Sequence, residues 1–249
     1  GARRWEWDFP AVEAAIERQP TKLFLLCQPN NPTGRVWDDE ELDTLARLAE
    51  KHDLVVCSDE IHNGLVLAPP GSPSRQSRVF ATLSPEIAAR TITLMAPSKT
   101  FNIPGLGAAF AVIPNTQLRK QFSAAAAGIV PHTNLLGMAA LEAAFTQCDD
   151  WRAALLDYLR SNAQAVENAV ANIPGLAMHP VEATYLAWID AREFAKARGI
   201  ANPAKYFETH GLGLSDGAAF GAPGFVRLNF GTRRALLEEA LARLHAAGR

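Results

Sequence analysis

Thr91-Ile-Thr-Leu-Met-Ala-Pro-Ser-Lys-Thr-Phe-Asn-Ile-Pro-Gly-Leu106 is the stretch on which the interpretation of the fold depends. Its first five residues are β-branched or apolar, which predicts a buried strand over 91–95. Ser98 and Lys99 follow at the point where this strand leaves the core. There the amine of Lys99 can be partly desolvated, which disfavours its charged form. A neutral amine is the nucleophile of Schiff-base chemistry, and an ordinary surface lysine is the competing interpretation.

Strands and helices alternate on both sides of this stretch. We expect strands at 22–27, 53–57, 91–95 and 107–113, and helices at 38–52, 116–127 and 134–146. Asp38 and Glu41 predict a capping box at the start of the first of these helices. The alternation predicts an α/β fold, with a mostly parallel sheet and helices on both faces. The apolar run 22–27 predicts a strand that is covered on both faces.

The last hundred residues have a different pattern. Residues 150–172 predict one long amphipathic helix, with candidate core residues Trp151, Leu155, Leu156, Leu159 and Val166. Shorter elements follow, with strands at 185–189 and 225–230 and helices at 191–198, 203–210 and 235–246. We therefore expect a large domain over 1–150 and a smaller α+β domain over 151–249. The stretch 211–217 lacks the third glycine of a dinucleotide-binding motif, so it predicts a loop.

Composition argues against several classes of partner. The formal net charge is -2 and no basic tract occurs, so we expect neither nucleic acid nor a membrane as a partner. The N-terminus lacks the apolar segment of a signal peptide, and the three widely spaced cysteines suit reduced thiols in the cytoplasm. A zinc site of Cys57, His52 and His62 lacks the usual ligand spacing, so we expect no metal.

Polar residues follow three of the predicted strands. Asn31 comes after the first strand, Asp59 and His62 after the second, and Ser98 and Lys99 after the third. Ligands of parallel sheets bind at the carboxyl ends of the strands, so we expect these side chains to converge.

Lysine, aspartate and asparagine in this setting suit pyridoxal 5'-phosphate (PLP). In this hypothesis Lys99 is the Schiff-base residue and proton shuttle, and Asp59 pairs with the ring nitrogen. Asn31 donates to the phenolate oxygen and Ser98 contacts the phosphate. Each residue also has a structural interpretation: a helix cap for Asp59, a turn for Asn31 and for Ser98, and a core or surface position for His62.

Three segments together resemble the fold type I, class I/II aminotransferase superfamily. They are Asn31-Pro-Thr-Gly34, Ser58-Asp-Glu-Ile-His62 and Ala96-Pro-Ser-Lys-Thr-Phe-Asn102, and their order and spacing match as well. The residues of the second and third segments resemble the bacterial cystathionine β-lyase-type branch more than the aspartate aminotransferases. The similarity continues through Thr184-Tyr-Leu-Ala-Trp188 and Val226-Arg-Leu-Asn-Phe-Gly231.

The resemblance implies a role for each candidate residue. Lys99 would bond to PLP, Asp59 would bind the pyridine nitrogen, and Asn31 would donate to the phenolate oxygen. His62 falls where aminotransferases commonly have a tyrosine that reaches the same oxygen. Arg227 would bind the substrate α-carboxylate through its planar fork, and a structural salt bridge is the alternative.

Two features depart from the family pattern. Many aminotransferases have an arginine eight residues after the lysine to bind the phosphate, and here that position is Gly107. The resemblance also begins within the large domain, so we expect an N-terminally truncated version of it. The family's upstream part supplies a phosphate-binding turn and an aromatic residue that stacks on the cofactor.

The resemblance implies a cytoplasmic homodimer that acts on an amino-acid substrate. We expect a PLP-dependent C–S β-lyase, which would cleave cystathionine or cysteine S-conjugates to pyruvate, ammonia and a thiol. An aminotransferase with the same site is the first alternative. A truncated, inactive fragment that acts by binding a partner protein is the second.

Overall fold

The computed structural model describes residues 4–68 and 77–249, which form two compact units. The lysine unit comprises residues 6–29, 36–68 and 77–153 and contains Lys99. The arginine unit comprises residues 4–5, 30–35 and 154–249 and contains Arg227. The turn-forming residues of 68–78 predict a surface loop, and this stretch lies outside the described residues except at its two ends.

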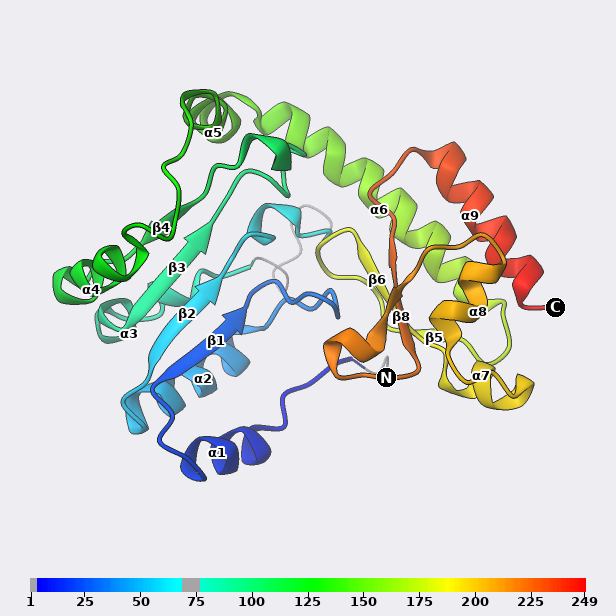
Figure 1. Cartoon of the computed structure of the whole chain (residues 1–249), viewed down its shortest axis with the longest axis horizontal. Coiled ribbons are helices and arrows are strands. Elements are labelled where there is room, and N and C mark those ends of the chain that lie inside the picture. The colour runs from blue at the N-terminus through cyan, green and yellow to red at the C-terminus, as the bar shows by residue number, and fades with distance from the viewer. Residues whose placement is uncertain (1–3, 69–76) are drawn as a thin grey trace. The chain divides into compact units, whose positions relative to one another are not determined.

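A four-stranded sheet forms the centre of the lysine unit. Its strands lie side by side in chain order, from β1 in blue to β4 in green (Figure 1). They are β1 (Leu23–Cys27), β2 (Val55–Asp59), β3 (Thr91–Met95) and β4 (Phe110–Val112). The first three strands are parallel and β4 is antiparallel to β3, which confirms the predicted α/β class with a mostly parallel sheet.

Helices precede, connect and follow the strands of the lysine unit along the chain. They are α1 (Phe9–Glu17), α2 (Asp39–Lys51), α3 (Pro85–Ala89), α4 (Thr116–Ala126) and α5 (Leu135–Gln147), with 3-10 turns η1 (Asn63–Leu65), η2 (Phe80–Thr82) and η3 (Pro104–Leu106). The predicted capping box is present, because the Asp38 side chain accepts from the Glu41 amide at 3.0 Å and Glu41 accepts from the Asp38 amide at 2.9 Å.

The two faces of β1 differ in burial. Leu26 and Val56 pack with Leu42 and Leu45 of α2 in the core of the unit. Burial of each such side chain contributes about 1.5–3 kcal/mol. On the other face Leu25 is 72% exposed, so the prediction that this strand is covered on both faces is wrong for the described chain. Successive side chains of a strand point to opposite faces, and β1 lies at the edge of its sheet.

A second sheet forms the centre of the arginine unit. Its order is β5 (Ala177–Met178), β6 (Leu186–Asp190), β8 (Phe225–Asn229) and β7 (Ser215–Asp216), and all three pairings are antiparallel. The helical elements are α6 (Asp149–Ala171), α7 (Arg192–Arg198), α8 (Pro203–Thr209), η4 (Gly217–Phe220) and α9 (Arg234–Ala247). The stretch 211–217 is therefore not wholly a loop, because β7 pairs with β8 inside it.

Helix α6 runs through the predicted domain boundary, and its first residues belong to the lysine unit. Leu159 and Val166 are buried as predicted. Trp151 is 47% exposed and is not a core residue, because one side of its ring stacks on Phe101 at 6.0 Å and the rest faces solvent. Among the helices that the structure describes, none has the length and apolarity needed to cross a membrane.

Candidate active site

Lys99 lies in a tight turn after β3. The Phe101 amide donates to the Pro97 carbonyl at 2.8 Å, and the Ile103 amide donates to the Ser98 carbonyl at 3.2 Å. These bonds fix the backbone on both sides of Lys99, which is half-buried like Ser98. The β3 strand and its exit turn therefore hold the lysine where the sequence predicts it.

Asp59 is the last residue of β2, on the strand next to β3. In register it lies between Cys27 of β1 and Leu94 of β3. Its side chain is exposed, and one carboxylate oxygen accepts from the Ile61 amide at 3.1 Å. Asp59 thus ends one strand and Lys99 follows the neighbouring parallel strand of the same unit, at the carboxyl ends of the strands, where ligands of such folds bind.

Glu60, which the sequence interpretation passes over, is buried beside Asp59. It is 1% exposed and accepts from the Ser58 hydroxyl, the Asn63 amide group and the Phe80 backbone amide, each at 3.0 Å. Burial raises the pKa of the Glu60 carboxyl above its usual range, although these donors favour the charged form. Glu60 lies between Asp59 and His62 in the sequence, but no pattern in the sequence indicates that it is buried.

The turn after Asp59 packs directly on the lysine turn. A Cβ atom at Gly64 would lie 2.5 Å from Oγ1 of Thr100, and Thr100 is only 4% exposed. Glycine at position 64 therefore permits the close approach of the two turns. His62, at the start of the same turn, is 3% exposed, which places it in the core rather than on the surface.

An apolar cavity of about 370 Å³ adjoins Asp59. Its lining includes Asp59, Met95, Phe110 and Val130. Among the predicted site residues, Asp59 lines this cavity and Lys99 does not. Burial and the charge of Asp59 raise the pKa of the Cys57 thiol, so Cys57 remains a neutral thiol near neutral pH. Because its lining is almost wholly apolar, the cavity itself offers little to a phosphorylated ligand.

Asn31 and Arg227 meet in the arginine unit. Nη1 of Arg227 donates to Oδ1 of Asn31 at 2.8 Å, and Nη2 donates to the Ser215 hydroxyl at 3.3 Å. The guanidinium also lies over the Phe220 ring, 4.7 Å from its centre. Burial lowers the pKa of the Arg227 guanidinium below its usual range, while the nearby Tyr185 opposes this shift. The β8 strand thus presents the arginine beside the loop that carries the predicted phenolate donor.

The structure distributes the six predicted site residues over its two units. Asp59, His62, Ser98 and Lys99 belong to the lysine unit, and Asn31 and Arg227 to the arginine unit. Gly107 has a φ of 60° at the end of η3, a backbone conformation that L-residues such as arginine rarely adopt.

One cluster of possible metal ligands occurs among residues 4–68 and 77–249. It consists of Glu13, Glu17 and His52, and it does not include Cys57 or His62. The ammonium of Lys51 lies 2.6 Å from Glu13 and 3.9 Å from Glu17. Lys51 therefore already supplies positive charge to these carboxylates.

Known proteins are similar to this chain in sequence. A sequence profile described as aminotransferase class I and II matches residues 2–244. Cystathionine beta-lyase PatB of Bacillus subtilis is 33% identical over 244 residues, a match that covers 96% of this chain and 62% of PatB. The chain therefore spans about three-fifths of the length of this curated relative.

Two solved structures are similar in fold as well. The crystal structure of OvoB has a TM-score of 0.92 and 47% identity, and the match covers 99% of this chain and 64% of that one. The structure of the PLP-bound C-S lyase from Staphylococcus hominis has a TM-score of 0.88 and 32% identity, with coverage of 98% and 61%.

Proposed function

The chain belongs to the aminotransferase class I and II family, and we propose that it provides the catalytic residues of a PLP-dependent C–S β-lyase. The substrate would be cystathionine or a cysteine S-conjugate. Water and this substrate would yield pyruvate, ammonia and a thiol. The names of PatB and of the Staphylococcus hominis C-S lyase support the choice of reaction.

The observation that carries the proposal is the hydrogen bond between Arg227 and Asn31. Asn31 accepts through its amide oxygen, so the amide nitrogen is the side that can donate to a phenolate oxygen. The guanidinium fork suits a carboxylate. Two residues that the sequence singles out for separate reasons are therefore in contact, 196 positions apart.

The candidate residues of the lysine unit are of the types that the same cofactor needs. PLP supplies an aldehyde that bonds to amines and a ring that accepts electrons. Lys99 would bond to that aldehyde until the substrate amine takes its place, and the freed Lys99 amine would then remove the proton from the α-carbon of the substrate. Asp59 would hold the proton on the ring nitrogen. Ser98 would donate to the phosphate, and His62 would lie on the phenolate side.

Arg227 would orient the substrate through its α-carboxylate. With the α-proton transferred to the Lys99 amine, the electron pair of the C–H bond forms a C=C bond as the C–S bond breaks. The sulfur leaves with that bond's electrons and takes a proton to become a thiol. We further propose that the protein is a homodimer in the cytoplasm. Each subunit would have a large domain over 1–150 and a smaller domain over 151–249.

An aminotransferase is the second candidate, and the description of the matching family profile favours it. Both reactions begin with removal of the α-proton, so Lys99, Asp59 and Asn31 serve either one. In the lyase reaction the substrate next loses its sulfur substituent, whereas in the aminotransferase reaction it gives up its amino group.

Product analysis separates the two candidates. Purified protein with PLP is incubated with cystathionine, and pyruvate and free thiol are measured. Release of both in equal amounts supports the lyase. Transfer of the amino group to a keto acid without pyruvate release would overturn it in favour of the aminotransferase. Borohydride reduction followed by mass analysis of the Lys99 peptide tests the site itself, because only a bonded lysine gains the cofactor's mass.

A further inference from the structure

The loop that carries Asn31 is held to the arginine unit by its own backbone. The Asn30 amide donates to the Arg35 carbonyl at 2.8 Å, and the amides of Glu182 and Ala183 both donate to the Gly34 carbonyl, at 3.1 and 2.9 Å. Gly34 has a φ of 71°, and a Cβ atom there would lie 3.0 Å from a methyl group of Val181. The segment 181–183 therefore forms one wall of this loop.

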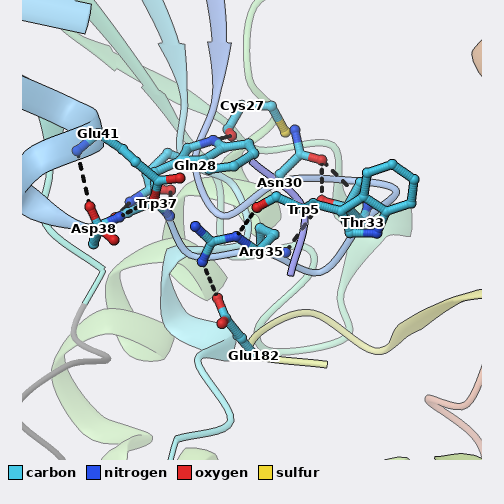
Figure 2. A network of polar contacts seen from close by, with 10 residues as sticks. All are labelled: Trp5, Cys27, Gln28, Asn30, Thr33, Arg35, Trp37, Asp38, Glu41 and Glu182. Carbon is cyan, nitrogen blue, oxygen red and sulfur yellow. Dashed lines mark hydrogen bonds and ion pairs between the residues drawn. The ribbon is translucent and has the colours of Figure 1, made fainter. Parts of the chain in front are cut away.

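Arg35, at the end of the same loop, forms a buried ion pair with Glu182. Its side chain is 4% exposed, and Nη1 lies 2.6 Å from the carboxylate of Glu182, which is 14% exposed. Nε of Arg35 also donates to the Trp5 carbonyl at 2.8 Å. Figure 2 shows the guanidinium between these two acceptors. Paired acceptors in fixed directions hold a planar guanidinium in one orientation.

A buried ion pair is a costly way to hold a loop if stability is its only purpose. Apolar residues of similar volume often serve as well, because they avoid the desolvation of two charges. Here the pair joins the last residue of the loop to the segment that forms its wall. The tip of that loop is Asn31, which accepts from Arg227.

We propose that Arg35 and Glu182 are positioning residues for the carboxylate site, because they hold the Asn31 loop where Asn31 can fix the guanidinium of Arg227. The proposal rests on the function proposed above and assigns a role to two residues outside the cofactor's contacts. It predicts that loss of the pair weakens binding of ligands with an α-carboxylate and leaves binding of simple amines unchanged.

Two small ligands distinguish these effects. L-Alanine carries an amine and an α-carboxylate but has no leaving group, whereas ethylamine has the amine alone. Each is titrated into the PLP-loaded protein while the visible absorption of the cofactor is followed. Displacement of Lys99 changes the spectrum in both cases, but only L-alanine needs Arg227.

Glu182→Gln is the first variant, because its amide oxygen can still accept from Arg35 while the charge is lost. Arg35→Lys keeps the charge and loses the fork. The double variant Arg35→Met/Glu182→Leu removes both charges together, which avoids an unpaired buried ion. Glu239→Gln is the matched control, because Glu239 pairs with Arg243 at 2.5 Å on the surface, where the side chains are 48–56% exposed.

We expect the dissociation constant of L-alanine to rise about tenfold or more in the three Arg35 and Glu182 variants, since the loss of one charge-assisted hydrogen bond to the carboxylate corresponds to a change of about this size. Ethylamine should bind all variants within about twofold of the wild type, because its binding depends on the Lys99 amine and not on Arg227. Thermal unfolding shows which variants are folded at the temperature of the titration.

The outcomes separate the two proposals. Equal L-alanine affinity in Glu182→Gln, the double variant and Glu239→Gln would overturn the positioning role alone. So would an equal loss of L-alanine and ethylamine binding, because that is the result of general disturbance. A wild-type protein whose spectrum does not respond to ethylamine would overturn the proposed function, and the positioning role with it.

Discussion

The two units reach their candidate residues in different ways. In the lysine unit, Asp59 ends β2 and Lys99 follows the neighbouring parallel strand β3, and backbone hydrogen bonds fix the turns after both strands. In the arginine unit, a single side-chain hydrogen bond joins Arg227 to Asn31 across 196 positions. The first arrangement follows from strand order, whereas the second depends on the packing of distant segments. We expect substitutions in the lysine unit to abolish the reaction and substitutions in the arginine unit to reduce affinity for the substrate.

The buried ionisable side chains of the two units also differ in their partners. Glu60 of the lysine unit accepts from three uncharged donors. Arg35 of the arginine unit has a charged partner in Glu182. Burial raises the pKa of the Glu60 carboxyl, so its charge responds to pH, whereas a paired ion responds to the loss of its partner.

The largest effect should come from Lys99→Ala in the lysine unit. We expect the visible absorption of the lysine-bound cofactor to disappear and kcat to fall at least about 10³-fold, since the variant loses both the bonding amine and the proton carrier. Lys205→Ala, on an exposed lysine of α8, is the control and should retain full activity. A Lys99→Ala protein that keeps the absorption band would show that another lysine holds the cofactor.

Much of the lysine unit is predictable from sequence because its determinants are local. The apolar run 91–95 and the capping box of Asp38 and Glu41 are both present where they are expected. The alternation of strands and helices also gives the parallel order. The exposed Leu25 is missed because an apolar run does not reveal which elements cover a strand.

The arginine unit is harder to predict, because its contacts join distant segments. No spacing in the sequence indicates that Arg35 meets Glu182 or that Asn162 donates to the carbonyl of Phe230. The same holds for the burial of Glu60, which depends on Phe80 of a later turn. Arg227 could be singled out only through the resemblance to a known family.

A smaller effect should follow from Arg227→Lys in the arginine unit. Lysine keeps the charge but cannot offer a planar fork, so one charge-assisted hydrogen bond, about 1.5–3 kcal/mol, would be lost. We expect kcat/KM to fall about 10- to 100-fold, mostly through KM. Steady-state kinetics with Arg243→Lys as control measures this. A fall in kcat at constant KM would place Arg227 in the chemical step instead.

Gly64→Ala tests how tightly the two turns of the lysine unit are joined. The new Cβ would lie 2.5 Å from Oγ1 and 2.7 Å from Cγ2 of Thr100, and such overpacking costs about 1–3 kcal/mol of unfolding free energy. Urea unfolding measures the cost. Gly64→Ala/Thr100→Ala should regain most of it, because both close atoms are removed and the Thr100 Cβ at 3.2 Å is the next contact.

Gly105→Ala provides the matched control for that experiment. It lies in the same unit, and an added Cβ would meet nothing within 4 Å. If Gly64→Ala and Gly105→Ala are equally stable, the two turns are not in tight contact. If Thr100→Ala fails to restore stability, the strain at Gly64 arises elsewhere.

The smallest effect should be the pH dependence that Glu60 adds to the stability of the lysine unit. An unfolded glutamate ionises near 4.5, and burial raises the pKa of Glu60 above this value in the folded chain. Between the two values the folded state holds more protons, so the unfolding free energy falls as the pH rises. Above the folded pKa this contribution is constant.

Glu60→Gln removes that titration while keeping a similar shape. Below pH 4.5 the neutral acid and the amide should give similar stabilities, and above it the variant should gain on the wild type until the folded pKa is passed. Urea unfolding at a series of pH values measures the difference, with the exposed Glu239→Gln as control for the loss of one charge. A wild type that instead gains on Glu60→Gln as the pH rises would mean that the donors from Ser58, Asn63 and Phe80 outweigh burial. The carboxylate would then be held ionised, and the contrast between the two buried charges would disappear.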